Sequence, residues 1–310
     1  MSDLVIEVSG LRKSFAGKVA VRGLDMQVRR GEIFGFLGPN GSGKTTSIRM
    51  LCGLLKPDAG SGQCLGFDVL SQSQRIKPHV GYMTQRFSLY DDLTVRENLE
   101  FVARIYGLAD GRRKVDAAID RAGLSRFAGL LAGSLSGGWK QRLALTSCTL
   151  HEPKLLLLDE PTAGVDPGAR RDFWDQVHRL AAQGVTALIS THYMDEAERC
   201  HRLAYIAYGD LLAAGTPDEL VRGSGLATLA VTSPEGPAAL HALAAELRGL
   251  PGVDQAVPFG NALHVSGRDP ALLERAVAGF DAGRFAWSRI GTSLEEVFIL
   301  LMRRSQEGKA

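Results

Sequence analysis

A glycine-rich run around residue 40 has residue types that bind phosphate groups. It comprises Gly38, Pro39, Asn40, Gly41, Ser42, Gly43, Lys44 and Thr45, is followed by Thr46, and matches the pattern G-x-x-x-x-G-K-[ST]. Its glycines let backbone N–H groups turn toward phosphate oxygens, and the N-terminal end of the following helix attracts the same anion. Lys44 would reach the β- and γ-phosphates, and the Thr45 hydroxyl would bind Mg²⁺. We predict a nucleoside triphosphate site, because an apolar strand before the run and a helix after it disfavour a turn that binds nothing.

Two adjacent carboxylates, Asp159 and Glu160, follow four consecutive leucines at 155–158. The leucines predict a strand buried on both faces, and parallel sheets bind ligands at the C-terminal ends of their strands. Asp159 would complete the Mg²⁺ site that Thr45 begins, and Glu160 would polarise an attacking water. A solvated acidic turn is the alternative for such a pair alone. The phosphate loop in the same chain favours the catalytic interpretation.

A second turn of small residues, Leu135-Ser136-Gly137-Gly138, precedes a helical segment that begins near Trp139. Ser136 is a typical helix N-cap, and the two glycines would expose N–H groups to an anion. On its own this turn indicates only the start of a helix. Its place between the phosphate loop and the acidic strand end makes it far more specific.

The elements that must position these residues form an α/β pattern. Alternating residues over 4–28 predict half-buried strands, and apolar runs predict buried strands at 32–37, 154–159 and 185–190. Helices are predicted at 45–55, 95–106, 113–122 and 170–183. This alternation is typical of a parallel sheet covered by helices.

The chain changes character after residue 220. Residues 221–225 form a short glycine-containing linker candidate. Beyond it, strands are predicted at 226–232, 253–257, 262–265 and 285–290, with helices that begin at Pro237 and Pro270. The order β-α-β-β-α-β predicts a small α+β ferredoxin-like domain. Ser293 and Glu296 form a capping-box pattern ahead of an apolar final helix.

Composition excludes several classes of protein. Lys plus Arg number 36 and Asp plus Glu number 34 among 310 residues, a net charge of +2, which argues against binding nucleic acid through bulk charge. No stretch approaches the ~18 apolar residues of a membrane span, and residues 1–5 lack the features of a signal peptide. The four cysteines lie far apart without zinc-site spacing. We therefore expect a soluble cytoplasmic protein with reduced thiols.

Together the three motifs, in this order, resemble the ATP-binding cassette (ABC) family, the nucleotide-binding subunits of transporters. The resemblance covers residues from about 4 to 220. It implies a P-loop NTPase cassette at 1–222, with a parallel-sheet core, an antiparallel β subdomain and a helical subdomain at about 87–150. Residues 226–310 would then form a C-terminal accessory domain. The expected cofactors are ATP and Mg²⁺.

The resemblance implies roles for four further residues. Gln85 matches the glutamine that senses Mg²⁺ and faces the membrane partner, and Asp166 matches a loop that crosses a dimer interface. His192 matches the histidine that contacts the γ-phosphate, and Phe15 stands where an aromatic ring packs on adenine. Out of context these residues would be a loop glutamine, a turn former, a strand-end histidine and a core phenylalanine. Their family spacing favours the functional interpretation.

The sequence departs from the family pattern at two positions. Trp139 replaces the usual glutamine of the LSGGQ motif, and Phe15 replaces the usual tyrosine. Neither change removes a phosphate ligand, because the proposed donors are Ser136 and backbone N–H groups. We interpret neither as a loss of activity.

One phosphate loop and one small-residue turn per chain imply pairing. In the family, ATP lies between the loop of one subunit and the turn of the other, so Leu135, Ser136, Gly137, Gly138 and Asp166 would contact the partner's ATP. The resemblance implies a homodimer, or a heterodimer with a close relative, beneath integral membrane permease subunits of about six spans each. Segments 151–153, 164–167 and 191–198 look most like the exporter branch, whose cassettes are peripheral on the cytoplasmic face of the inner (plasma) membrane.

Two other classes of protein remain as alternatives. A soluble ABC-type ATPase switch that acts on ribosomes or DNA usually carries two cassettes and basic insertions, whereas this chain has one cassette and little net charge. A P-loop kinase would explain Lys44 but neither the turn at 135–138 nor His192. We therefore expect an ATP hydrolase that energises export of a small molecule, drug or lipid-like cargo, with no nucleic-acid partner.

Overall fold

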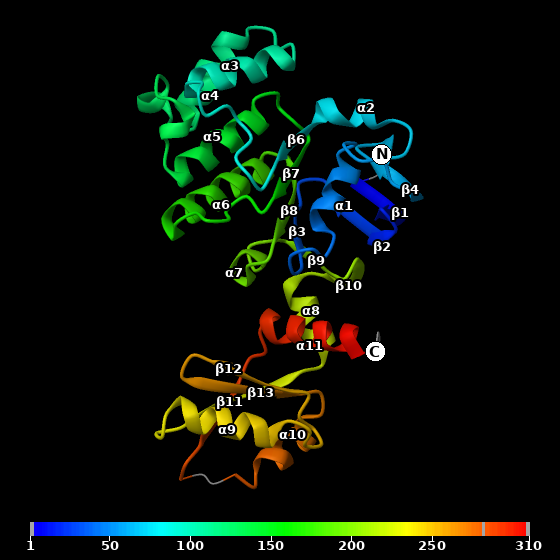
Figure 1. Ribbon diagram of the computed structural model, residues 1–310, viewed down its shortest axis with the longest axis vertical. Helices are drawn as coiled ribbons and strands as arrows, with labels where there is room; N and C mark the ends of the chain where they lie inside the picture. The colour runs from blue at the N-terminus through cyan, green and yellow to red at the C-terminus, as the bar shows by residue number, and fades with distance from the viewer. Residues whose placement is uncertain (1–2, 281–282, 308–310) are drawn as a thin grey trace. The chain divides into compact units, whose positions relative to one another are not determined.

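The computed structural model describes residues 3–280 and 283–307 and divides the chain into two units, with the boundary between Ala213 and Ala214 (Figure 1). Among the described residues, none of the helices combines the length and the apolar character needed to cross a lipid bilayer. Each unit has its own sheet and its own core.

Five parallel strands form the centre of the first unit. They lie in the order β9-β3-β8-β7-β6 and comprise β3 (Ile33–Leu37), β6 (Val80–Met83), β7 (Leu155–Asp159), β8 (Thr186–Thr191) and β9 (Arg202–Ala207). Every residue of β3, β7 and β8 is buried, as expected for strands covered on both faces. The parallel core predicted from the apolar runs is confirmed.

Antiparallel strands extend this sheet at one edge. They are β1 (Leu4–Phe15), β2 (Lys18–Arg29), β4 (Ala59–Cys64) and β5 (Phe67–Asp68). The parallel pairing of β10 (Asp210–Gly215) with β2 at Asp210 and Gly23 joins both parts into one ten-stranded sheet of the described residues. In the second half of β2, buried and exposed residues alternate, so that Leu24, Met26 and Val28 face the core.

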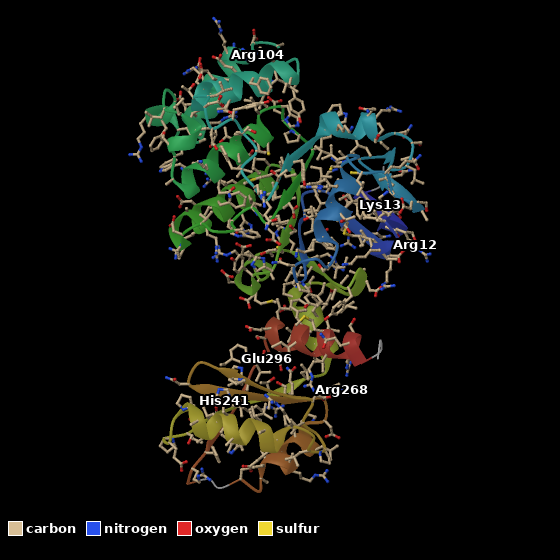
Figure 2. All side chains as sticks on the ribbon, viewed as in Figure 1. Arg12, Lys13, Arg104, His241, Arg268 and Glu296 are labelled. Carbon is tan, nitrogen blue, oxygen red and sulfur yellow. The ribbon has the colours of Figure 1, made fainter. Side chains whose placement is uncertain are left out.

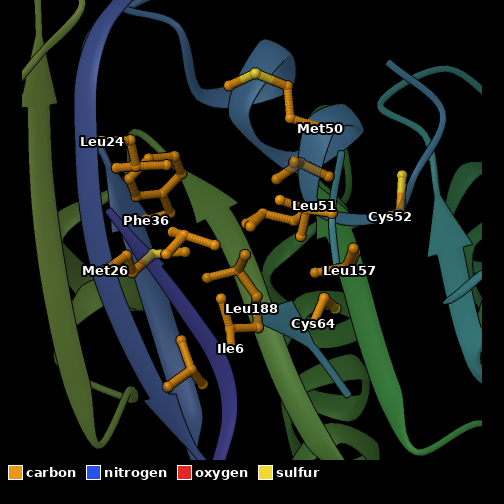
Figure 3. Close-up of a cluster of buried hydrophobic side chains, with 14 of the residues drawn as sticks. Ile6, Leu24, Met26, Phe36, Met50, Leu51, Cys52, Cys64, Leu157 and Leu188 are labelled. Atoms are coloured by element: carbon orange, nitrogen blue, oxygen red, sulfur yellow. The ribbon is translucent and has the colours of Figure 1, made fainter. Parts of the chain in front are cut away.

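The main core lies between these strands and helix α1 (Lys44–Leu51), which begins directly after the glycine-rich loop. Figure 3 shows side chains of α1 packed among strand residues that include Ile6, Leu24, Met26, Phe36, Leu157 and Leu188. Ile48, Met50 and Leu51 of α1 are completely buried. This packing fixes the helix, and with it the position of the loop that precedes it.

Three helices with their own core form a helical part of the first unit: α3 (Val95–Ile105), α4 (Gly111–Arg121) and α5 (Gly137–Thr149). Thr94 and Glu97 form a capping box at the start of α3, with the Glu97 carboxylate accepting from the Thr94 N–H at 2.8 Å. Helix α6 (Pro167–Ala182) contacts both α5 and β8. Short turns complete the unit: α2 (Ser73–Ile76), α7 (Met194–Ala197) and 3₁₀ turns at Lys77–His79, Ser125–Phe127 and Ala132–Ser134.

All four cysteines are free and buried. Burial raises the pKa of the Cys52 thiol to about 11 and the pKa values of Cys64 and Cys148 to about 12. These thiols are therefore protonated and shielded at neutral pH, as residues of the packed core.

The second unit is an antiparallel sheet with helices, in the strand order β12-β13-β11-β14. Its elements are α8 (Pro217–Ser224), β11 (Ala227–Thr232), α9 (Pro237–Leu247), β12 (Gln255–Phe259), β13 (Ala262–Gly267), α10 (Pro270–Val277), β14 (Ala286–Ile290) and α11 (Leu294–Glu307). From β11 to β14 the succession is strand, helix, strand, strand, helix, strand. Glu296 lies on α11 (Figure 2). It contacts His264 of β13, with 2.7 Å between Oε1 and Nδ1.

The predicted linker at 221–225 is largely helical. Thr216 and Glu219 form a capping box, Pro217 stands at the first helical position, and α8 continues to Ser224 before Gly225 ends it at a φ of 67°. Helix α8 contacts α11 of the second unit. The glycines at 223 and 225 therefore mark the end of a helix rather than a flexible connection.

Candidate active site

The loop between β3 and α1 needs glycine at two positions. At Gly38, with φ 154°, an added Cβ would lie 2.0 Å from the Ile206 carbonyl oxygen. At Gly43, with φ 109°, it would lie 2.6 Å from the Ala20 carbonyl oxygen. The loop is therefore held against β9 and β2 by contacts that leave no space for a side chain, and its backbone bends back at the N-terminus of α1.

A cavity of about 310 Å³ opens at this loop. It is lined by Ala20, Asn40, Gly41, Ser42, Gly43, Lys44, Thr45, Thr46, Gln85 and Glu160. Most of the lining was predicted from the sequence, and the structure brings the loop residues together with Gln85 and Glu160. Gly38 and Pro39 lie beneath, where both carbonyl oxygens accept from the Lys44 ammonium at 2.7 and 3.2 Å.

The cavity fits a phosphate chain. Burial lowers the pKa of Lys44, while the carboxylates of Glu160 and Asp159 act in the opposite direction. Among the residues that the structure describes, the buried hydroxyls of Ser42 and Ser47 have no hydrogen-bond partner. The site is rich in hydrogen-bond donors and therefore suits an anion. The donors are a buried ammonium, the N-terminus of α1 and an unpartnered hydroxyl in the lining.

Glu160 is the centre of the catalytic residues that the sequence predicted. Its Oε1 lies 3.4 Å from Lys44 Nζ, and its Oε2 lies 3.3 Å from His192 Nδ1 and accepts from Gln85 Nε2 at 2.9 Å. Glu160 is 7% exposed and adopts a φ of 45°, which non-glycine residues rarely adopt. Such a conformation at a strand end is typical of a side chain held in place for function.

The three predicted Mg²⁺ ligands lie around the same strand ends. Thr45 and Gln85 line the cavity, whereas Asp159 is buried beside it at the end of β7. Asp159 Oδ1 accepts from the Ser190 hydroxyl at 2.6 Å. Hydroxyl, amide and carboxylate oxygens are the ligand types that Mg²⁺ prefers, so this set fits the ion.

Ser190 is a site residue for which the sequence analysis gave no role. Besides donating to Asp159, its Oγ accepts from the Glu160 N–H at 2.9 Å. It therefore orients both members of the acidic pair. The available signal was its position at the end of the strand predicted at 185–190, two residues before His192.

The small-residue turn opens on a different cavity. Ser136, Gly138 and Asp166 line a cavity of about 170 Å³ together with residues of α5 and α6. An added Cβ at Gly138 would lie 2.6 Å from Ala169 Cβ, so glycine is needed for the close approach of α5 and α6. Gly137 follows Ser136 at the start of α5, and Leu135 is buried before it. The two cavities share no lining residue among the residues that the structure describes.

Ser136 was expected to cap helix α5, and the structure differs from this expectation. Ser136 occupies the N-cap position of α5, but its side chain makes no capping hydrogen bond. Asp166 does cap its helix: Oδ1 accepts from the N–H groups of Gly168 and Ala169, both at 3.0 Å. The hydroxyl of Ser136 is thus not used by its own helix.

The two unusual aromatic residues have distinct surroundings. Phe15, at the end of β1, is 49% exposed and lies outside the cavity lining, with the Lys13 ammonium 5.7 Å from its ring. Trp139 packs on Phe127 with 4.5 Å between ring centroids. The guanidinium groups of Arg126 and Arg142 lie 5.3 and 4.8 Å from its ring. Trp139 is therefore part of the packing around α5.

Comparison with known proteins identifies the family. The model of the ABC transporter family matches residues 21–163. Over 318 residues the chain is 36% identical to the Nod factor export ATP-binding protein I of Burkholderia thailandensis, covering 99% of this chain and all of that protein. The chain belongs to the ABC transporter family. Its first unit is the ATP-binding, ATP-hydrolysing cassette of that family.

Other relatives match the cassette alone. The probable multidrug ABC transporter ATP-binding protein YbhF of Escherichia coli K12 is 46% identical over 221 residues, which cover 70% of this chain. The match covers 38% of YbhF, so the chain spans less than half the length of that relative. Among solved structures, cbiO1 of Clostridium perfringens is similar with a TM-score of 0.64 and 28% identity, over 72% of this chain and 95% of that one. An ATP-binding cassette in its ADP conformation is similar with a TM-score of 0.63 and 26% identity, over 70% and 93%.

Proposed function

We propose that this ABC cassette protein hydrolyses ATP between two copies of the chain and thereby energises export through a separate membrane permease. The observation that carries the proposal is the separation of the two anion-binding elements. The Lys44 loop and the Ser136 turn open on different cavities of one chain. A second copy, or a close relative, would supply the turn that completes each site.

The geometry supports a division of roles among the site residues. Lys44 and the loop N–H groups would hold the β- and γ-phosphates. The Glu160 carboxylate would accept a proton from a water whose oxygen attacks the γ-phosphorus, as the bond to the β-phosphate oxygen breaks and ADP leaves. His192, 3.3 Å from Glu160, would contact the γ-phosphate. Ser136 and the glycines after it, with Asp166, would contact the ATP of the partner copy, and Phe15 would stack on adenine.

Thr45, Gln85 and Asp159 would hold Mg²⁺, which neutralises charge that develops on the phosphate oxygens. Gln85 is the residue that joins this set to Glu160, through its 2.9 Å hydrogen bond. Because Gln85 begins the segment that leads into the helical part, a displacement of that segment would change the surroundings of Glu160. This contact supports a link between the catalytic carboxylate and a partner that docks nearby.

An exposed apolar surface next to that segment supports permease docking. Tyr90, Leu130 and Leu131 are 51%, 48% and 49% exposed. Backbone hydrogen bonds connect their segments: Ala132 N–H donates to Leu93 O at 2.8 Å, and Gly133 N–H to Asp91 O at 2.9 Å. Large apolar side chains exposed together on one surface are typical of a protein-binding site.

Export is the direction that the relatives support. One similar protein is named for Nod factor export and another for multidrug transport, and the first matches along its whole length. We accordingly propose a cargo that is a small molecule, a drug or a lipid-like compound. The chain would lie on the cytoplasmic face of the inner membrane, bound to permease subunits of about six spans each.

The test is co-purification from detergent-extracted membranes of the source cell. The wild-type chain should bring down an integral membrane protein, and the variants Tyr90→Asp and Leu131→Asp should lose it while binding ATP normally. Leu272→Asp, at an exposed leucine of the second unit, is the matched control and should keep the partner. If the wild-type chain brings down no membrane protein, it acts as a soluble ATPase switch and the transport role is wrong.

A further inference from the structure

Glu196, on the short helix α7 just after His192, is a buried carboxylate within the cassette. It is 1% exposed. Its Oε1 accepts from the Thr162 hydroxyl, and its Oε2 accepts from the Thr191 hydroxyl at 2.6 Å. Arg170 Nε lies 3.5 Å from Oε1 and places a positive charge beside the carboxylate.

These three partners belong to the three segments that carry the site residues. Thr162 lies two residues after Glu160, and its carbonyl accepts from the Val165 N–H at 3.3 Å in the loop that leads to Asp166. Thr191 ends β8 directly before His192 and accepts from the Tyr193 N–H at 3.0 Å. Arg170 lies in the first turns of α6, which Asp166 caps.

The aromatic neighbours of His192 extend the same network. The Arg170 guanidinium lies 4.5 Å from the Tyr193 ring, and the Tyr193 and His192 rings lie 4.1 Å apart. Arg170 also reaches Asp195, with 3.4 Å between Nη1 and Oδ2. The position of the His192 ring therefore depends on residues that Glu196 holds on both sides.

A buried carboxylate is costly unless it is paired, and an apolar residue of similar size often replaces such a group without loss of stability. A carboxylate differs from an apolar residue here because it accepts from two hydroxyls at once and fixes their orientation. Thr162 and Thr191 are themselves buried, each 1% exposed. The network is thus closed to solvent and ties two backbone segments to a single side chain.

We propose that Glu196 is a positioning residue for hydrolysis, which sets the relative placement of Glu160, His192 and the Asp166 loop without touching the nucleotide. This inference rests on the proposed roles of Glu160 and His192. Glu196 is not among the residues that line the cavity at the Lys44 loop, so its replacement should lower kcat and leave the affinity for ATP unchanged. A displacement of reacting groups by about 1 Å can lower a rate by about 100-fold, which sets the expected size of the effect.

The experiment compares Glu196→Gln with Glu198→Gln, an exposed glutamate on the adjoining turn. Steady-state phosphate release gives kcat and KM, a fluorescent ATP analogue gives the dissociation constant, and thermal unfolding reports the fold. Glu196→Gln should lose about 10- to 100-fold in kcat at unchanged nucleotide affinity, while Glu198→Gln matches the wild type. Thr162→Val, which removes one arm of the network, should show a smaller loss in kcat and serves in place of Glu196→Gln if that variant unfolds.

A double variant separates positioning from a general structural role. Because part of the effect of Glu196 acts through His192, Glu196→Gln should lower kcat by a smaller factor in the His192→Ala background than in the wild type. Full additivity, or a wild-type kcat for both Glu196→Gln and Thr162→Val, would overturn the inference. If His192→Ala itself hydrolyses ATP at the wild-type rate, the role proposed above for His192 is wrong instead, so the two failures are distinct.

Discussion

Glu160→Gln is the substitution that most sharply separates binding of ATP from its hydrolysis. Glutamine has the size of glutamate, so the side chain would keep its place near Lys44, Gln85 and His192, at 3.4, 2.9 and 3.3 Å. It cannot accept a proton from water. General-base catalysis contributes about 10²- to 10⁴-fold, so turnover should fall by that factor, which corresponds to about 3–5 kcal/mol in the activation free energy.

The same substitution should stabilise the closed pair. If ATP joins two copies and hydrolysis separates them, a slow variant accumulates in the paired state. Light scattering after size exclusion should give twice the monomer mass for Glu160→Gln in ATP and the monomer mass in ADP. Glu152→Gln, at an exposed carboxylate 3.0 Å from Lys114, is the control and should behave as wild type. A Glu160→Gln chain that turns over normally would show that Glu160 is not the general base, and one that stays monomeric in saturating ATP would show that ATP does not join two copies.

Three further substitutions test other parts of the account. Gly138→Ala should abolish turnover, because the new Cβ would lie 2.6 Å from Ala169 Cβ. Single chains should still bind a fluorescent ATP analogue. Normal phosphate release by this variant would contradict the prediction. Trp139→Gln restores the usual family residue and removes two cation–π contacts, so it should lower the free energy of unfolding by about 1–2 kcal/mol. Urea unfolding measures this, and an unchanged midpoint urea concentration would show that the two contacts contribute nothing. Burial lowers the pKa of His151, so the folded chain favours the neutral ring and loses stability as the pH falls below about 6.5. The thermal unfolding temperature of His151→Gln should therefore depend less on pH over that range. Equal slopes of unfolding temperature against pH for the variant and the wild type would exclude this cause.

Local sequence patterns were sufficient to predict the phosphate loop and the strand that ends at Asp159. The glycine spacing at 38–43 reflects contacts that exclude a Cβ, and a leucine run buried on both faces permits few alternatives. The order of the elements predicted the parallel core, because chains in which strands and helices alternate commonly fold into a parallel sheet covered by helices. The helix predicted at 45–55 ends earlier, at Leu51, because Gly53 adopts a φ of 71° that breaks it.

Contacts between distant segments could not be predicted. Nothing near Glu196 in the sequence indicates that its carboxylate accepts from Thr162, which lies 34 residues away. Glycines at 223 and 225 suggested a linker, yet the capping residue Thr216 and Pro217 decide in favour of a helix. A resemblance to the family supplied the role of Gln85, and only the structure shows that its amide reaches Glu160.

A mixture of two inactive variants can show whether each ATP site is built from two chains. Lys44→Ala disables the phosphate loop and Ser136→Arg disables the turn, so each homodimer should be inactive. In a mixed dimer, the intact loop of one chain faces the intact turn of the other and forms one working site. An equal mixture should therefore regain about one quarter of the wild-type phosphate release, because half of the randomly formed dimers have one good site of two. A mixture as inactive as its components, although the chains pair, would contradict an ATP site shared between two copies.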